Sequence, residues 1–177
     1  MKEMLILVDT HDNERGSGEK TEVHRKGELH RAFSIVIFSA EGKMLIQKRA
    51  KGKYHSGGQW SNACCGHPRL GEDIEKAAHR RLREELGFDC GLRGIFQFVY
   101  KARLDGGITE YEYDHTFIGT YYGKMKSDPR EVEDLKWIRM DTLTSEIRRH
   151  PQNYTPWFEI ICMELNLRPN SWPSSRS

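Results

Sequence analysis

The chain has 177 residues, 37% of them hydrophobic and 31% charged, a composition typical of a globular protein long enough to bury a core. A formal net charge of +2 gives no overall basic surface for nucleic acid, so an anionic ligand would need a local cluster of lysine and arginine. No apolar run approaches the roughly 20 residues that span a bilayer, which predicts no membrane partner and a cytoplasmic location. The four cysteines lack zinc-ribbon or disulfide-framework spacing, which indicates reduced thiols.

The first sixty residues predict strands followed by a loop. The apolar run at residues 4–8 predicts a buried strand, and the polar, glycine-containing residues 11–20 predict a surface loop or hairpin. Residues 32–40 and 44–48 are apolar runs on either side of a three-residue turn, which predicts a hairpin. Residues 49–59 contain three glycines and three cations, a composition that suits a mobile loop near an anion.

The middle of the chain predicts an extended segment, a helix and a second hairpin. Residues 60–66 are expected to be extended, so the adjacent Cys64 and Cys65 should point to opposite sides. Residues 73–87 carry an apolar stripe at helical spacing, with aspartate to cap the first turn and glycine to end the last. Residues 95–102 and 108–122 read as two long strands joined by an Asp-Gly-Gly turn.

The last third predicts one more strand and two helices. Residues 135–140 read as a strand, Asp141 is expected to cap a helix to about His150, and Thr155-Pro156 to open the final helix. Residues 169–177 are expected to be a disordered tail. We therefore predict an α/β (α+β) protein with a single domain over residues 1–168, whose first 31 residues contribute to the site.

The predicted helix carries charges on its inward face. At about 100° per residue, Arg81 and Glu85 fall within the apolar arc, and such charges need a partner or a ligand. Either they pair with each other, or the Arg81 guanidinium binds a phosphate and the Glu85 carboxylate binds a divalent cation. On the predicted strand at residues 108–122, Glu110, Glu112 and Asp114 share one face. This acidic face is either solvated or converges with histidines on a metal.

Residues 66–88 resemble the Nudix box, in which conserved spacing places glutamates on one helix. The match runs Gly66, Glu72, Arg80, Arg81, Leu82, Arg83, Glu84, Glu85, Leu86, Gly87 and Phe88. Arg81 stands where the motif has glutamate. Hydrolytic members of the family cluster magnesium ions on these carboxylates to activate water, so a cation at this position argues against a diphosphate hydrolase. It favours contact with an anionic substrate instead.

The segment Asn62–Pro68 (NACCGHP), the upstream histidines and Glu110-Tyr111-Glu112 resemble the type I isopentenyl diphosphate isomerases, over roughly residues 24–157. The resemblance implies a Nudix-type mixed sheet between helices and the isomerisation of isopentenyl diphosphate to dimethylallyl diphosphate, which feeds isoprenoid biosynthesis. It implies these roles: Cys65, Glu112 and Tyr100 catalytic; Lys20, Arg49, Lys53, Arg81 and Trp157 substrate-binding; His24, His30, His67, Glu110, Glu112 and Glu85 metal-binding.

The same resemblance implies two cations. Mg²⁺ would accompany the substrate diphosphate through Glu85, and a second divalent metal (Mn²⁺, Zn²⁺ or Mg²⁺) would occupy the histidine and glutamate site. The expected partner is a small isoprenoid diphosphate, and the sequence leaves the oligomeric state open. His11, His55, His79, His115 and His150 are expected at the surface or in packing, and Cys90 and Cys162 in the core. Two rival functions are a Nudix pyrophosphohydrolase and a non-catalytic metal- or diphosphate-binding module.

Overall fold

The computed structural model describes residues 2–170 and residue 172. Within them, nine strands form one mixed sheet. The strands are β1 (Met4–Val8), β2 (Glu14–Glu19), β3 (His30–Phe38), β4 (Met44–Arg49), β5 (Trp60–Asn62), β6 (Cys64–Gly66), β7 (Leu92–Arg103), β8 (Thr109–Thr120) and β9 (Val132–Ile138). The α-helices are α1 (Lys20–Lys26), α2 (Ile74–Leu86), α3 (Met140–Arg149) and α4 (Pro156–Leu167), with short 3-10 turns at Asp105–Gly107 and Pro151–Asn153.

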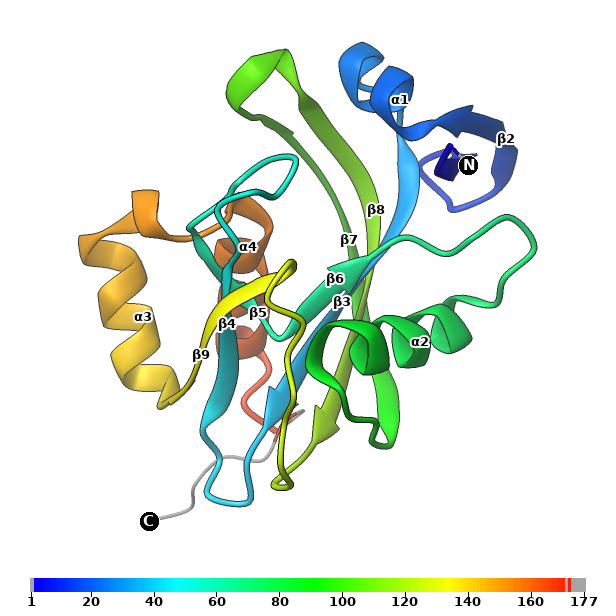
Figure 1. Ribbon diagram of the computed structural model, residues 1–177. Coiled ribbons are helices and arrows are strands. Elements are labelled where there is room, and N and C mark those ends of the chain that lie inside the picture. Colours follow the sequence, from blue (N-terminus) through cyan, green and yellow to red (C-terminus); the bar gives the residue numbers. More distant parts are fainter. Residues whose placement is uncertain (1, 171, 173–177) are drawn as a thin grey trace.

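Strand β3 is the centre of the sheet. It pairs with β1, β4 and β6 in antiparallel fashion and with β8 in parallel over nine residue pairs, from His30–Glu112 to Phe38–Thr120. Every residue from Ala32 to Phe38 is buried, as expected for a strand that is covered on both faces. The neighbouring β7 and β8 form a long curved hairpin, whose tip lies at the same end of the molecule as α1 (Figure 1).

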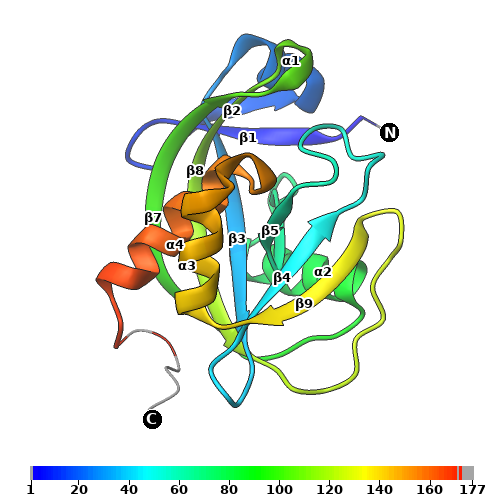
Figure 2. The same ribbon diagram turned by 90° about the vertical axis from the view of Figure 1, so that its left-hand side faces the viewer.

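Helices cover both faces of the sheet, as Figures 1 and 2 show. On one face, Phe33, Ile35 and Ile37 pack with Leu82 and Leu86 of α2. On the other face, the alternate residues of β3, Val36 and Phe38, pack with residues of α3 and α4 such as Leu143, Trp157 and Phe158. The two-residue period of β3 therefore divides its side chains between two cores. The predicted mixed sheet between helices is confirmed.

Most of the predicted elements are present. Helix α2 is capped at Asp73, which accepts from the backbone N–H of Lys76 at 3.0 Å, and it ends at Gly87, whose φ of 70° suits glycine. The predicted hairpin at residues 32–48 is β3–β4, although these two strands pair directly only near the turn. Residues 14–19 form β2 and pair with β1, so the expected loop or hairpin is a hairpin.

Several details differ from the prediction. The helix expected to be capped by Asp141 begins two residues earlier, at Met140, with Arg139 as its N-cap, and the Asp141 side chain accepts from the backbone N–H of the adjacent Thr142. The strand expected to reach Met140 ends at Ile138. In the predicted disordered tail, residues 171 and 173–177 lie outside the described residues, whereas Trp172 stacks on Phe38 with ring centroids 5.0 Å apart. Among the described residues, no helix is long and apolar enough to cross a membrane.

Candidate active site

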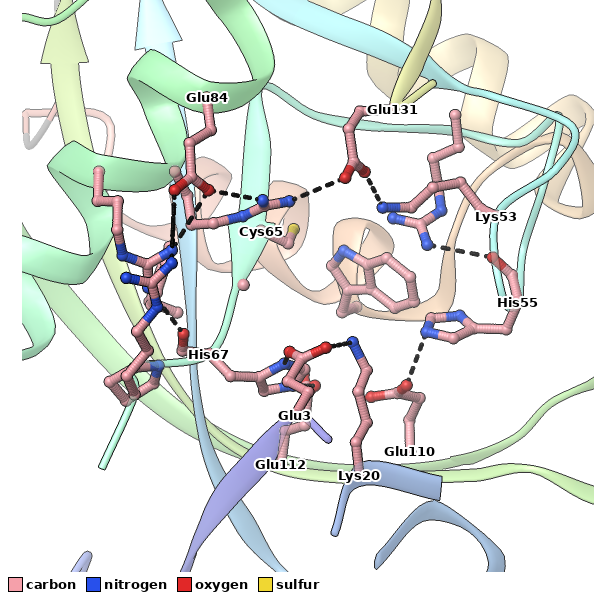
Figure 3. A pocket seen from close by; sticks show the side chains of 18 of the residues that line it. Glu3, Lys20, Lys53, His55, Cys65, His67, Glu84, Glu110, Glu112 and Glu131 are labelled. Carbon is pink, nitrogen blue, oxygen red and sulfur yellow. Dashed lines mark hydrogen bonds and ion pairs between the residues drawn. The ribbon is translucent and has the colours of Figure 1, made fainter. Parts of the chain in front are cut away.

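A cavity of about 340 Å³ opens between the second half of α2, the loop after β4 and the N-terminal segment (Figure 3). It gathers side chains from parts of the chain that are far apart in sequence. All the residues predicted to be catalytic or substrate-binding line it, namely Lys20, Arg49, Lys53, Cys65, Arg81, Tyr100, Glu112 and Trp157. Of the predicted metal ligands, His67, Glu110 and Glu112 also line it, while His24, His30 and Glu85 lie behind its wall.

The two cysteines of β6 face opposite sides of the strand, as predicted. Cys64 is fully buried and packs in the core on the α2 side. Cys65 lines the cavity, and its Sγ lies 3.2 Å from Asn62 Oδ1 and 3.5 Å from Ser34 Oγ. Burial and the nearby Asp114 raise the pKa of the Cys65 thiol to about 12. Cys65 is therefore a thiol at neutral pH.

The acidic face of β8 is buried, so the alternative of a solvated face is wrong. Glu110 and Asp114 are each 1% exposed and Glu112 is 8% exposed. The Tyr100 hydroxyl donates to Glu112 Oε2 at 2.6 Å, and His67 Nε2 lies 3.0 Å from Glu112 Oε1. Burial alone would raise the pKa of Glu112, but its contacts with His30 and His67 hold that pKa well below its usual range. Burial and the adjacent Glu112 raise the pKa of Glu110 well above its usual range.

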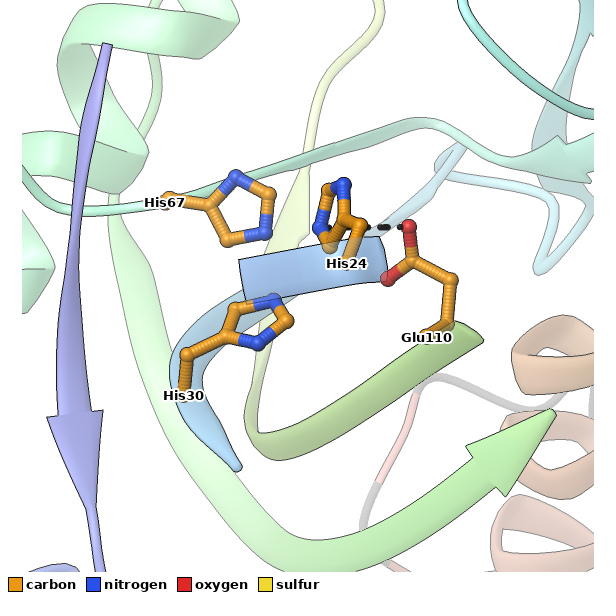
Figure 4. A group of neighbouring side chains, drawn as sticks. All are labelled: His24, His30, His67 and Glu110. Atoms are coloured by element: carbon orange, nitrogen blue, oxygen red, sulfur yellow. Dashed lines mark ion pairs between the residues drawn. The ribbon is translucent and has the colours of Figure 1, made fainter. Parts of the chain in front are cut away.

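Three imidazoles and one carboxylate converge beside this face (Figure 4). One ligand atom each of His24, His30, His67 and Glu110 lies within 4.8 Å of the others. They come from α1, β3, the loop after β6 and β8. The parallel register of β3 and β8 sets His30 directly opposite Glu112, and the short helix α1, with Glu19 as its N-cap and Gly27 at its end, brings His24 over the group.

The residues present fit a divalent metal ion. Both ring nitrogens of His24, Nε2 of His30 and Oε1 of Glu110 are buried without a hydrogen bond in the described part of the chain, although His55 Nε2 lies 2.9 Å from Glu110 Oε1. Buried polar atoms are rarely left without a hydrogen bond. His24 Nε2 lies 3.6 Å from Glu110 Oε1, close but without hydrogen-bond geometry. Burial and the neighbouring His30 lower the pKa of His24 to about 3, so its ring is neutral, which is the form that binds metals. Nitrogen and oxygen donors suit Zn²⁺, Mn²⁺ and related ions.

The predicted diphosphate cations also line the cavity, each with a partner of its own. Arg49 donates to the backbone carbonyl of His55 at 3.1 Å, and its guanidinium lies 5.4 Å from the Trp157 ring centroid. Lys20 pairs with Glu3 at 2.9 Å, while Lys53 pairs with Glu131. An incoming diphosphate would therefore exchange these intramolecular partners for phosphate oxygens.

Arg81 and Glu85 form the internal ion pair that the helix pattern left as one alternative. Arg81 also donates to Glu84 Oε2 at 2.8 Å and remains at the cavity wall. Glu85 is 3% exposed and accepts a further bond from Gln47 Nε2 at 3.2 Å. Because both of its oxygens have partners, Glu85 would bind a magnesium ion only after releasing one of them.

His55 was expected at the surface or in packing; its ring does pack, but it also lines the cavity. Its Nε2 lies 2.9 Å from Glu110 Oε1, and its ring meets Trp157 edge to face with centroids 5.9 Å apart. The loop of residues 50–59 has no periodicity from which the direction of a side chain follows. The available signal was composition, since the three cations of residues 49–59 already indicated an anion nearby.

These features belong to a known class of protein. The NUDIX domain matches residues 28–158, and the chain belongs to this family. The fold is similar to the crystal structures of DR0079 from Deinococcus radiodurans (TM-score 0.78, 17% identity, covering 92% of this chain and 98% of that chain) and of a MutT protein from Methanosarcina mazei Go1 (TM-score 0.67, 13% identity, covering 80% and 96%).

Within that class, the chain belongs to the isopentenyl-diphosphate Delta-isomerase family. It is 52% identical to isopentenyl-diphosphate Delta-isomerase 2 of Photorhabdus laumondii over 166 residues, which covers 94% of each chain. It is 48% identical to the isopentenyl-diphosphate Delta-isomerase of Serratia proteamaculans over 165 residues, covering 93% of this chain and 92% of that one.

Proposed function

We propose that this protein isomerises isopentenyl diphosphate to dimethylallyl diphosphate, a step that supplies isoprenoid biosynthesis. The observation that carries the proposal is that Cys65 and Glu112 line one cavity, which Arg49, Lys53 and Arg81 also line. The two proton-carrying groups come from strands on either side of β3, Cys65 from β6 and Glu112 from β8. A substrate held by its diphosphate would extend its hydrocarbon end between them.

The reaction adds a proton at the terminal alkene carbon and removes one from the carbon next to the diphosphate-bearing carbon. An unactivated alkene is a weak base, so the reaction needs an acid and a base positioned close to a carbocation-like intermediate. Cys65 is held as a thiol and Glu112 as a carboxylate by their surroundings. Tyr100 donates to Glu112 and holds this carboxylate in place as protons move.

Aromatic and cationic side chains define the two ends of the substrate. The buried face of Trp157 would stabilise positive charge on the hydrocarbon by up to about 2 kcal/mol when water is excluded. Lys20, Arg49, Lys53 and Arg81 would bind the diphosphate. We propose that residues 49–58 and the N-terminal segment close over the cavity, because water would otherwise quench the cation to an alcohol.

His24, His30, His67, Glu110 and Glu112 would hold a divalent metal, either Mn²⁺, Zn²⁺ or Mg²⁺. When bound, such an ion supplies positive charge that orients Glu112 and tunes its basicity. A second ion, Mg²⁺, is proposed to accompany the substrate diphosphate and to contact Glu85 once that carboxylate exchanges its bond with Arg81.

Incubation with isopentenyl diphosphate and Mg²⁺ in deuterated water tests the proposal. The expected product is dimethylallyl diphosphate with deuterium in the new methyl group, detected by nuclear magnetic resonance and mass spectrometry. Cys65→Ala should abolish isomerisation, while Cys64→Ala, at the neighbouring core position, should retain it. A wild-type protein that forms no isomer, or a Cys65→Ala protein with full activity, would overturn the proposal.

A Nudix pyrophosphohydrolase is the alternative function. It predicts phosphate release from nucleoside diphosphate derivatives with Mg²⁺, and incubations with these compounds in place of isopentenyl diphosphate measure this directly. Arg81 disfavours it, because this residue places a guanidinium against Glu84 and Glu85 where a hydrolase would gather metal ions.

A further inference from the structure

A buried polar network lies behind Cys65, with Asn62 of β5 at its centre. Asn62 is fully buried. Its amide nitrogen donates to the backbone carbonyl of Ile35 at 3.1 Å and to that of Cys64 at 2.8 Å. A side-chain amide has only two N–H groups, so both donors are used. This fixes the orientation of the amide, and Oδ1 is the atom that faces Cys65.

Asn62 Oδ1 accepts two hydrogen bonds that lead to the cavity. Cys65 Sγ donates to it at 3.2 Å, and the Ser61 hydroxyl donates to it at 3.0 Å. Ser61 Oγ in turn accepts from the indole N–H of Trp157 at 3.1 Å. One carbonyl oxygen thereby joins the predicted catalytic thiol to the aromatic ring expected beside the carbocation.

The hydrogen atoms on the Asn62, Ser61 and Thr155 side of this network are all accounted for. The Ser61 hydroxyl has a single hydrogen and donates it to Asn62 Oδ1. At the 3.0 Å contact between Ser61 and Thr155, the Thr155 hydroxyl is therefore the donor. Ser61 then donates one bond and accepts two, its full capacity. Ser61 and Thr155 are both fully buried. A network in which every group is satisfied specifies one arrangement, and a partly satisfied network does not.

We propose that Asn62 is a positioning residue for the isomerisation, and this inference rests on the proposed function. Asn62 stands behind the cavity wall and acts through Cys65 directly and through Ser61 on Trp157. Its two anchors belong to β3 and β6, so it ties the thiol to the centre of the sheet. Correct placement matters because a displacement of about 1 Å between reacting groups can reduce a rate by about 100-fold.

The test compares Asn62→Ala and Ser61→Ala with Ser39→Ala. Ser39 is a matched control, since it is a buried serine that bonds the backbone of the β3–β4 turn, at Glu41 and Lys43, away from the cavity. For Asn62→Ala we expect kcat to fall by about 10- to 100-fold, with the KM for isopentenyl diphosphate and the Kd for inorganic pyrophosphate unchanged within about twofold. The diphosphate cations are untouched by this substitution. Rates are expressed per folded molecule, with the folded fraction taken from circular dichroism.

Ser61→Ala keeps the inference testable if Asn62→Ala does not fold. Its kcat should fall severalfold at constant KM, while Ser39→Ala retains the wild-type kcat. The inference is overturned if Ser61→Ala and Ser39→Ala behave alike, or if Asn62→Ala keeps its kcat within twofold. It is also overturned if the loss of kcat is matched by weaker pyrophosphate binding, which would indicate a general distortion. None of these outcomes removes isomerisation by the wild-type protein, whose absence would instead refute the proposed function.

Discussion

Replacing Arg81 by methionine should destabilise the protein by about 2–3 kcal/mol, because Glu85 would lose its charged partner. Breaking a buried ion pair costs about 3–5 kcal/mol. The Glu85 side chain is 4% exposed, but that of Arg81 is 21% exposed, so water screens the pair from one side and the cost falls to the lower end of this range or below it. Gln47 still donates to Glu85 and limits the loss. For a chain of this length, the expected fall in Tm is about 4–12 °C.

Arg83→Met is the matched control, two positions along the same helix. The Arg83 side chain is 55% exposed and pairs with Asp89 at the surface, so its loss should cost about 0–1 kcal/mol. Equilibrium unfolding in urea and calorimetry measure both variants. Equal, small destabilisation of the two variants would refute the reasoning, since the buried Glu85 carboxylate would then not need the Arg81 guanidinium. Added Mg²⁺ should stabilise Arg81→Met more than wild type if Glu85, once freed, binds the ion.

The remaining predictions concern pH, the loop histidine and the metal. Hydrogen bonding from Arg80 lowers the pKa of Glu72 from 4.5 to about 2. Glu72→Gln should therefore lower the free energy of unfolding by about 1 kcal/mol at pH 7, after allowance for solvent screening. Urea unfolding should show that this difference between variant and wild type disappears as the pH falls from 4.5 through 2. His55→Phe should weaken Mn²⁺ binding about 10- to 100-fold in calorimetric titrations, whereas His79→Phe, at a surface carboxylate, should not; equal affinities would contradict the prediction. Mn²⁺ at about 100 times its Kd should stabilise chelator-treated protein by about 2.7 kcal/mol, and no such gain is expected in His24→Ala; an equal gain would argue against the site.

The parts of the site on regular elements followed from the sequence. A period of two residues placed Glu110, Glu112 and Asp114 on one face of a strand and separated Cys65 from Cys64. The apolar stripe of α2 placed Arg81 inward. In each case the backbone repeat fixes the direction of a side chain once one apolar residue is assigned to the core.

The parts on short or irregular segments did not follow. Helix α1 has seven residues, and Val23 and His24 are its buried positions, too little apolar pattern to reveal a helix. The direction of His55 depends on a loop whose shape is set by tertiary contacts such as Arg49 with the His55 carbonyl. The partners of Glu85 also depend on Gln47 of β4, 38 positions earlier in the chain, which helix periodicity does not include.

The direct opposition of His30 and Glu112 in the parallel β3–β8 ladder limits how the chain can vary in length. A single-residue insertion or deletion in β8 between Glu112 and Thr120 would either shift the register or force a bulge. A register shift would turn the carboxylates of Glu110 and Glu112 to the outer face of the sheet. The turn at Asp105–Gly107, where Gly106 and Gly107 have positive φ, lies outside this ladder. Insertions should therefore be tolerated at the tip of the β7–β8 hairpin and excluded from the strand beyond it, which makes the tip the place to graft a peptide or a label.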